Sequence, residues 1–124
     1  MASIPEYEVL FYETRNGWCP VDDFLDTLTL KVKAKLEKWL EQLEIHGPNL
    51  PRPYADLLRD KIRELRLKFG SDQYRFLYFF LNKKIIITHG FIKKTNEVPE
   101  VEIERSIKYR NDFLIRFGKG EIEL

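Results

Sequence analysis

The chain has 124 residues, and we expect it to form one domain over residues 1–124, because single domains cluster near this length. Hydrophobic residues make up 44% and charged residues 33%, a balance that excludes an intrinsically disordered protein. The net charge of +1 argues by itself against a nucleic-acid ligand, but residues 51–94 hold eleven Lys or Arg against four Asp or Glu. This local charge of +7 can attract phosphates at short range.

The N-terminal segment, Met1–Leu10, lacks the basic start and the long apolar run of a signal peptide. The longest apolar stretch, Phe76–Leu81, is too short to span a membrane. We therefore expect a cytoplasmic protein with no membrane partner. The single cysteine, Cys19, has no second thiol or histidine cluster near it in sequence, so we expect no disulfide, no metal site and no cofactor.

The first half of the chain predicts one strand and two helices. Residues 7–12 (YEVLFY) are apolar and β-prone, which predicts a strand. Pro20 suits the first position of a short amphipathic helix, and a longer helix begins near Thr29 and ends at Gly47-Pro48. The segment Pro48–Pro53 contains three prolines and is expected to be a rigid surface connection.

The second half predicts a three-stranded antiparallel meander, because short turn sequences separate three β-prone runs, Ile62–Phe69, Gln73–Leu81 and Lys84–Ile92. Pro99 then opens a C-terminal helix that ends at Gly118. The order predicts an α+β fold in which the helices, including the C-terminal one, pack on one face of a twisted, mostly antiparallel sheet.

The first run of the meander predicts a charged face, since alternation places Glu64, Arg66 and Lys68 together and opposite to Arg63. Arg75 lies in an otherwise apolar run. A guanidinium there needs an open face or a partner, because burying an unpaired charge costs on the order of several kcal/mol. A structural salt bridge to Glu64, or an exposed position at the edge of the sheet, is the alternative to a functional role for Arg75.

The other candidate functional residues could also have purely structural roles. Lys93 and Lys94 follow the last strand, where ligand contacts are common, but they could also be a solvated pair. His89 could transfer a proton or be a satisfied structural group. Tyr74 and Tyr78 could stack on bases, although aromatic residues in a strand usually belong to the core.

Our hypothesis from these residues is a phosphodiester-binding groove formed by Arg66, Lys68, Arg75, Lys93 and Lys94. RNA carries its own nucleophile, the 2′-hydroxyl, so cleavage requires only that the protein aligns this oxygen and stabilises charge at the phosphate. Arginine suits the task because it donates two hydrogen bonds to phosphate oxygens and stays charged. Such a mechanism needs no metal.

Three segments together resemble the HigB-like, phage-derived toxins of the RelE/ParE superfamily. The segments are Ile62-Arg63-Glu64-Leu65-Arg66, Tyr74-Arg75-Phe76-Leu77-Tyr78-Phe79 and His89-Gly90-Phe91-Ile92-Lys93-Lys94-Thr95. The order of the predicted elements agrees with this family over nearly the whole chain. The resemblance implies a RelE-like compact fold.

The same resemblance implies a toxin of a type II toxin–antitoxin system that cleaves mRNA on the ribosome. Arg75 matches the family's arginine at the scissile phosphate, Arg66 matches a basic residue on the preceding strand, and Lys93 or Lys94 matches the residue that stabilises the transition state. These are the expected catalytic residues. The expected RNA contacts are Lys68, Arg63, His89 and Tyr74.

The expected partners are mRNA, the ribosome and a HigA-like helix-turn-helix antitoxin, in a heterotetrameric complex. The sequence departs from many relatives in offering only Tyr109 as a C-terminal Tyr or His, which leaves the proton-transfer group unassigned. Two alternatives remain, a ParE-like inhibitor of DNA gyrase and a toxin that retains only antitoxin binding. If Arg75 contacts phosphate, Arg75→Ala should remove toxicity and leave the fold intact.

Overall fold

The computed structural model describes residues 4–124, so the first three residues of the segment examined for a signal peptide lie outside it. In chain order the elements are β1 (Glu8–Phe11), α1 (Pro20–Leu25), α2 (Leu30–His46), the 3-10 helix η1 (Gly47–Asn49), β2 (Ala55–Leu57), β3 (Arg63–Phe69), β4 (Asp72–Leu81), β5 (Lys84–Lys93) and α3 (Glu100–Gly118). The predicted strand, two helices, meander and C-terminal helix are therefore confirmed, with bounds that differ by one or two residues.

The strands form one sheet in the order β1-β5-β4-β3-β2. The three strands of the meander pair antiparallel as predicted, and β1 adds to β5 in parallel register, with Glu8 opposite Lys84. The short strand β2 was not predicted. It has three residues, Ala55–Leu57, and follows the proline-rich connection, so it carries too little alternation to be recognised.

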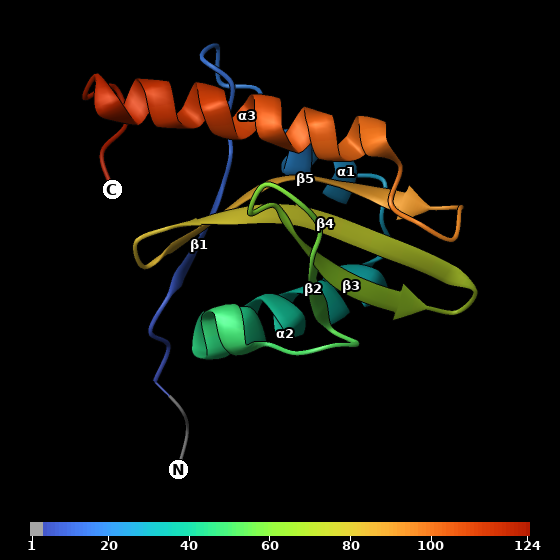
Figure 1. Cartoon of the computed structure of the whole chain (residues 1–124). Coiled ribbons are helices and arrows are strands. Elements are labelled where there is room, and N and C mark those ends of the chain that lie inside the picture. Colours follow the sequence, from blue (N-terminus) through green and yellow to red (C-terminus); the bar gives the residue numbers. More distant parts are fainter. Residues whose placement is uncertain (1–3) are drawn as a thin grey trace.

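The prediction that all helices share one face of the sheet is wrong. Apolar side chains point to both faces of β4, since Phe76 and Leu77 are both fully buried and belong to different hydrophobic clusters. Residues of α1 and α2 form the cluster that contains Phe76, whereas Phe113 of α3 packs in the cluster that contains Leu77. Figure 1 shows α3 and α2 on opposite sides of the sheet.

Local sequence explains where the helices begin and how closely one of them approaches the sheet. Thr29 caps α2, because its side-chain oxygen accepts a hydrogen bond from the Val32 amide. Next to α1, Gly90 has no side chain where a Cβ would lie 2.6 Å from the Phe76 ring and 2.7 Å from the Phe24 ring. The missing side chain at Gly90 thus lets the aromatic residues of α1 and β4 pack directly against β5.

The helix α3 covers only part of its face of the sheet. Figure 1 shows the end of the sheet formed by the β3–β4 hairpin extending past the N-terminal end of α3. Side chains on this uncovered part, Arg66 and Gln73 among them, are partly exposed. No helix in residues 4–124 is long and apolar enough to cross a bilayer.

Candidate active site

Four charged side chains meet on the uncovered part of the α3 face, Glu64, Arg66, Arg75 and Lys93, and we call them the arginine–glutamate cluster. Their strands place them together, because Arg66 is directly opposite Arg75 across the β3–β4 pair, and residues directly opposite share a face. Lys93 is opposite Gln73, two positions before Arg75 on β4, and so lies on this face as well.

The carboxylate of Glu64 lies between two guanidinium groups. Its Oε1 is 3.2 Å from Arg75 Nε and 3.3 Å from Arg66 Nε. Both contacts are ion pairs without the alignment of a hydrogen bond, and the buried Nε of Arg75 has no hydrogen-bond acceptor among the described residues. The other Arg75 nitrogens donate to the Tyr74 carbonyl at 3.1 Å and to Gln73 Oε1 at 2.9 Å.

Burial shifts the ionisation of these groups toward their neutral forms. It raises the pKa of Glu64 above 4.5, against the opposing effect of Arg75 and Arg66. It lowers the pKa of Arg75, which Glu64 partly offsets. The pKa of Lys93 is lowered from 10.5, first by desolvation and then by the nearby charge of Arg75. Glu64 and Lys93 thus each hold a pKa displaced toward neutrality, as proton-transfer groups require.

Two hollows open beside the cluster, and Arg66 lines both of them. The first has a volume of about 480 Å³ and includes Glu64, Lys93 and the β5–α3 loop in its lining. The second has a volume of about 320 Å³ and lies along the edge of β3, where Lys68, Gln73 and Arg75 line it. A ligand bound at Arg66 would therefore have room to extend in two directions.

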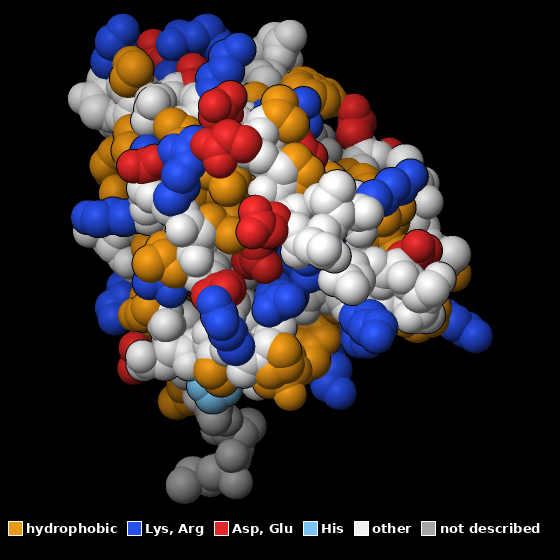
Figure 2. Space-filling model, turned by 45° about the vertical axis from the view of Figure 1, so that its right-hand side comes forward, with side chains coloured by type: hydrophobic (Ala, Val, Ile, Leu, Met, Phe, Trp, Pro, Cys, Tyr) orange, Lys and Arg blue, Asp and Glu red, His pale blue; other side chains and the backbone are white. Residues whose placement is uncertain are grey.

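The surface around the hollows is mixed in charge. Figure 2 shows a central band of acidic side chains with Lys and Arg side chains on both sides of it. On the face shown, acidic side chains interrupt the Lys and Arg side chains, which do not form one continuous basic patch. Asp56, in the lining of the larger hollow, is paired with Arg52 at 2.7 Å and adds no net charge there. Attraction of a phosphate depends on short-range contacts within the hollows.

The structure brings together four of the five residues that our hypothesis assigned to one groove. Arg66, Arg75 and Lys93 belong to the arginine–glutamate cluster, and Lys68 lines the smaller hollow next to them. Lys94 does not join them, because it lies beyond the end of β5, is exposed and lines neither hollow. The suggested salt bridge between Arg75 and Glu64 is present, and the Arg75 side chain is 2% exposed.

Three residues expected to contact RNA lie elsewhere. Arg63 points to the opposite face of β3, with its guanidinium 5.5 Å from the centre of the Phe80 ring. Tyr74 is 6% exposed within the cluster packed by α1 and α2, which is the core position that aromatic residues usually take. Neither side chain reaches the arginine–glutamate cluster, because alternation along the strands sends it to the other face.

The third, His89, is buried beneath α3. Its Nδ1 lies 3.1 Å from Thr88 Oγ1 and its Nε2 lies 3.6 Å from Glu102 Oε1, and it lines neither hollow. The adjacent His89 lowers the pKa of Glu102 below 4.5. In this position His89 helps to hold α3 against β5. This agrees with a structural role for His89, the second of the two roles considered from the sequence.

Sequence reasoning missed two features of the site. Glu64 was considered only as a salt-bridge partner, although alternation had already placed it on the face of Arg66. The pair Trp39 and Tyr54 in the smaller hollow gave no signal, since Trp39 reads as part of the buried stripe of α2 and Tyr54 follows prolines. Among residues 4–124, no three His, Cys, Asp or Glu side chains gather where they could hold a metal ion.

A comparison with protein-family models identifies the family of this chain. The family model of phage-derived Gp49-like proteins (DUF891) matches residues 23–110, more than half of the chain. The matched range includes α2, the whole meander and every member of the arginine–glutamate cluster. No curated protein matches the chain.

Proposed function

Because this chain belongs to the phage-derived Gp49-like family, which is part of the RelE/ParE-like toxin group, we propose that it is a toxin that cleaves mRNA. In this proposal it is the HigB-like toxin of a type II toxin–antitoxin system and acts on ribosome-bound mRNA in the cytoplasm without a metal. The observation that carries the proposal is the arginine–glutamate cluster, where one carboxylate and one lysine with displaced pKa values lie beside two arginines.

The first chemical step is removal of the proton from the RNA 2′-hydroxyl. Glu64 takes this proton as general base, and burial, which raises its pKa, makes the carboxylate a stronger base. The 2′-oxygen then attacks the adjacent phosphorus atom. Glu64 lines the larger hollow, so a ribose bound there can reach its carboxylate. This assigns the proton-transfer group that the sequence left open.

The second step is departure of the 5′-oxygen. Lys93 donates a proton to this oxygen as the P–O bond breaks, and its lowered pKa makes the ammonium group a stronger acid. Arg66, whose side chain is 31% exposed, binds the non-bridging phosphate oxygens. The products are a 2′,3′-cyclic phosphate and a 5′-hydroxyl. Arg75 does not contact the substrate in this proposal; its ion pair with Glu64 holds the carboxylate in position.

Membership in the toxin group also supports partners for the chain. We propose that a HigA-like helix-turn-helix antitoxin neutralises the toxin in a heterotetrameric complex, and that the ribosome presents the mRNA. A ParE-like inhibitor of DNA gyrase remains the alternative. The buried carboxylate between two arginines favours the nuclease, since an inhibitor that only binds its target does not need a proton-transfer group.

Induced expression in a bacterial host tests the proposal. We expect growth arrest together with new 5′ ends inside translated mRNAs, mapped after growth stops. Growth arrest with intact mRNA and inhibited gyrase would replace the nuclease with the ParE-like reading. A chain that does neither but binds an antitoxin would be a toxin that has lost its activity.

Lys93 and Lys94 form a matched pair for a substitution experiment. We expect Lys93→Ala to lower the rate of mRNA cleavage by roughly 100- to 1,000-fold, because the leaving oxygen loses its proton donor. Lys94→Ala should keep the wild-type rate, since Lys94 is exposed and lines neither hollow. The measurement is cleavage of ribosome-bound mRNA by equal amounts of each folded protein. Equal losses in both variants would contradict the assignment of Lys93.

The pH dependence of cleavage follows from the two displaced pKa values. The base form of Glu64 is lost as pH falls through its raised pKa, so the acid limb should have its midpoint above 4.5. The acid form of Lys93 is lost as pH rises through its lowered pKa, so the midpoint of the alkaline limb should lie below pH 10.5. Single-turnover cleavage of ribosome-bound mRNA by excess toxin measures both limbs. An acid limb at or below 4.5 would exclude Glu64 as the base.

A further inference from the structure

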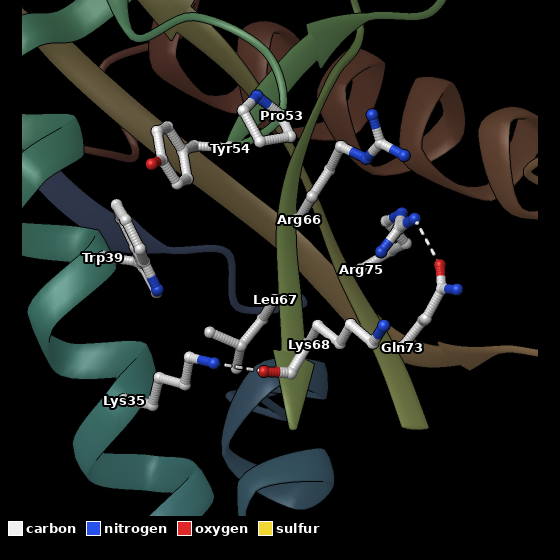
Figure 3. Close-up of a pocket in the computed structure, with 9 residues that line it drawn as sticks. All are labelled: Lys35, Trp39, Pro53, Tyr54, Arg66, Leu67, Lys68, Gln73 and Arg75. Carbon is white, nitrogen blue, oxygen red and sulfur yellow. Dashed lines mark hydrogen bonds between the residues drawn. The ribbon is translucent and has the colours of Figure 1, made fainter. Parts of the chain in front are cut away.

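The smaller hollow contains an aromatic pair that the proposed reaction does not use. The hollow lies where β3 continues past the short strand β2, and Figure 3 shows its lining: Lys35, Trp39, Pro53, Tyr54, Arg66, Leu67, Lys68, Gln73 and Arg75. In this view Trp39 and Tyr54 are on one side, with Arg66, Gln73 and Lys68 across from them. No Asp or Glu is in this lining, so the hollow is suited to an anionic ligand.

The two aromatic rings form a stacked wall. The ring centres of Trp39 and Tyr54 are 4.4 Å apart, and the ring planes differ by 24°. Tyr54 is 38% exposed, although it stacks on Trp39. The Tyr54 backbone is held by two hydrogen bonds: its amide donates to the Pro51 carbonyl at 2.9 Å, and its carbonyl accepts from the Arg66 amide at 2.7 Å. An exposed aromatic face beside cations is the arrangement that proteins use to stack nucleobases.

We propose that the Trp39–Tyr54 wall binds the base of a nucleotide that neighbours the scissile phosphate. The proposal rests on the proposed function and adds a base-binding subsite to it. Arg66 lines both hollows, so a phosphate held at the arginine–glutamate cluster has its flanking nucleoside next to the wall. Lys35 and Lys68 then lie near the continuing backbone. The hollow of about 320 Å³ is at the small end of the range of ligand sites, roughly 300–1,000 Å³.

Intrinsic fluorescence gives a direct test, because the chain contains only two tryptophans, Trp18 and Trp39. Trp18→Phe leaves Trp39 as the single reporter. The probes are 2′-O-methyl trinucleotides, which lack the nucleophile and stay intact, and tripolyphosphate, which carries charge without bases. We expect the trinucleotides to quench Trp39 emission and tripolyphosphate to leave it unchanged.

Substitution of Tyr54 supplies the second arm. Tyr54→Ala should weaken trinucleotide binding by roughly 5- to 100-fold, the usual effect of removing one base-stacking ring. Tyr54→Phe keeps the ring and should bind as the wild type does. Lys35→Ala, which removes a charge outside the core, should weaken the binding of trinucleotides and of tripolyphosphate to the same extent, as measured for both ligands by titration calorimetry. Circular dichroism before each titration confirms that the variant is folded.

The outcomes separate the subsite from the reaction. Equal trinucleotide affinity in Tyr54→Ala and wild type, or equal quenching by tripolyphosphate, overturns the subsite even if mRNA is cleaved. If Tyr54→Ala weakens binding but Lys93→Ala cleaves as the wild type does, the subsite holds and the assigned chemistry fails. A hollow that receives a protein segment instead of RNA would leave Trp39 emission unchanged with every trinucleotide, which also overturns the subsite.

Discussion

Glu64→Gln is expected to lower the rate of RNA cleavage by roughly 100- to 10,000-fold, the range for loss of a general base. Glutamine has nearly the same shape and keeps a side-chain oxygen beside Arg66 and Arg75, but it cannot take a proton from the 2′-hydroxyl. The rate is measured in single-turnover reactions with saturating toxin, where binding does not limit it. The variant should still bind uncleavable RNA.

Asp56→Asn is the matched control for this substitution. Asp56 lies directly opposite Glu64 across the β2–β3 pair and lines the same hollow. Its partner Arg52 is largely exposed, and we expect the loss of this pair to change the cleavage rate little. Full cleavage by Glu64→Gln would show that another group, or water, removes the proton. A large loss in both variants would indicate that the acidic charge matters and not the base.

Arg75→Ala should lower the free energy of unfolding by about 3 kcal/mol, because it removes one partner of a buried ion pair and leaves a cavity. The side chains of Arg75 and Glu64 are 2% and 6% exposed. This burial predicts a less stable Arg75→Ala variant than the sequence alone led us to expect. Urea unfolding at neutral pH, followed by circular dichroism, measures the change.

Arg66→Ala gives the comparison. Arg66 pairs with the same carboxylate, but its side chain is 31% exposed, so its removal should cost less than about 1 kcal/mol. Arg75→Ala within about 1 kcal/mol of wild type would mean that Arg75 is not a structural partner of Glu64. Loss of toxicity in Arg75→Ala alone is therefore not a test of phosphate contact, whereas loss of toxicity in the stable Arg66→Ala is.

Much of the fold was predictable because hydrophobic periodicity and turn residues act locally. Pro20, Thr29 and Pro99 marked helix starts within one residue. The side of the sheet that each helix covers was not predictable in this way. The side that each helix covers follows from the apolar side chains on both faces of β4: Phe76 on one face and Leu77 on the other each pack against a helix layer that excludes water. The sequence displayed this double-sided pattern, and we interpreted it as a single buried face.

The part of the site that follows from the alternation of side chains along the strands could be predicted from the sequence. Arg66, Lys68 and Arg75 came together because they share a face, and Arg63 and Tyr74 separated from them for the same reason. The burial of Arg75 and His89 could not be predicted from the sequence pattern. Whether Arg75 is open to a ligand depends on Gln73 and Glu64, and the position of His89 beneath α3 depends on a helix that begins eleven residues later. Tertiary packing decides both.

The parallel pairing of β1 with β5 has a consequence for the order in which the protein folds. Glu8 and Lys84, which form an ion pair at 2.8 Å, are separated by 76 positions in the chain. The cluster residues, by contrast, all lie on β3, β4 and β5, which are joined by tight turns. Contacts between near neighbours form sooner, because closing a short loop loses less entropy. We therefore expect the cluster residues to meet early in folding, before the parallel pairing of β1 with β5 forms.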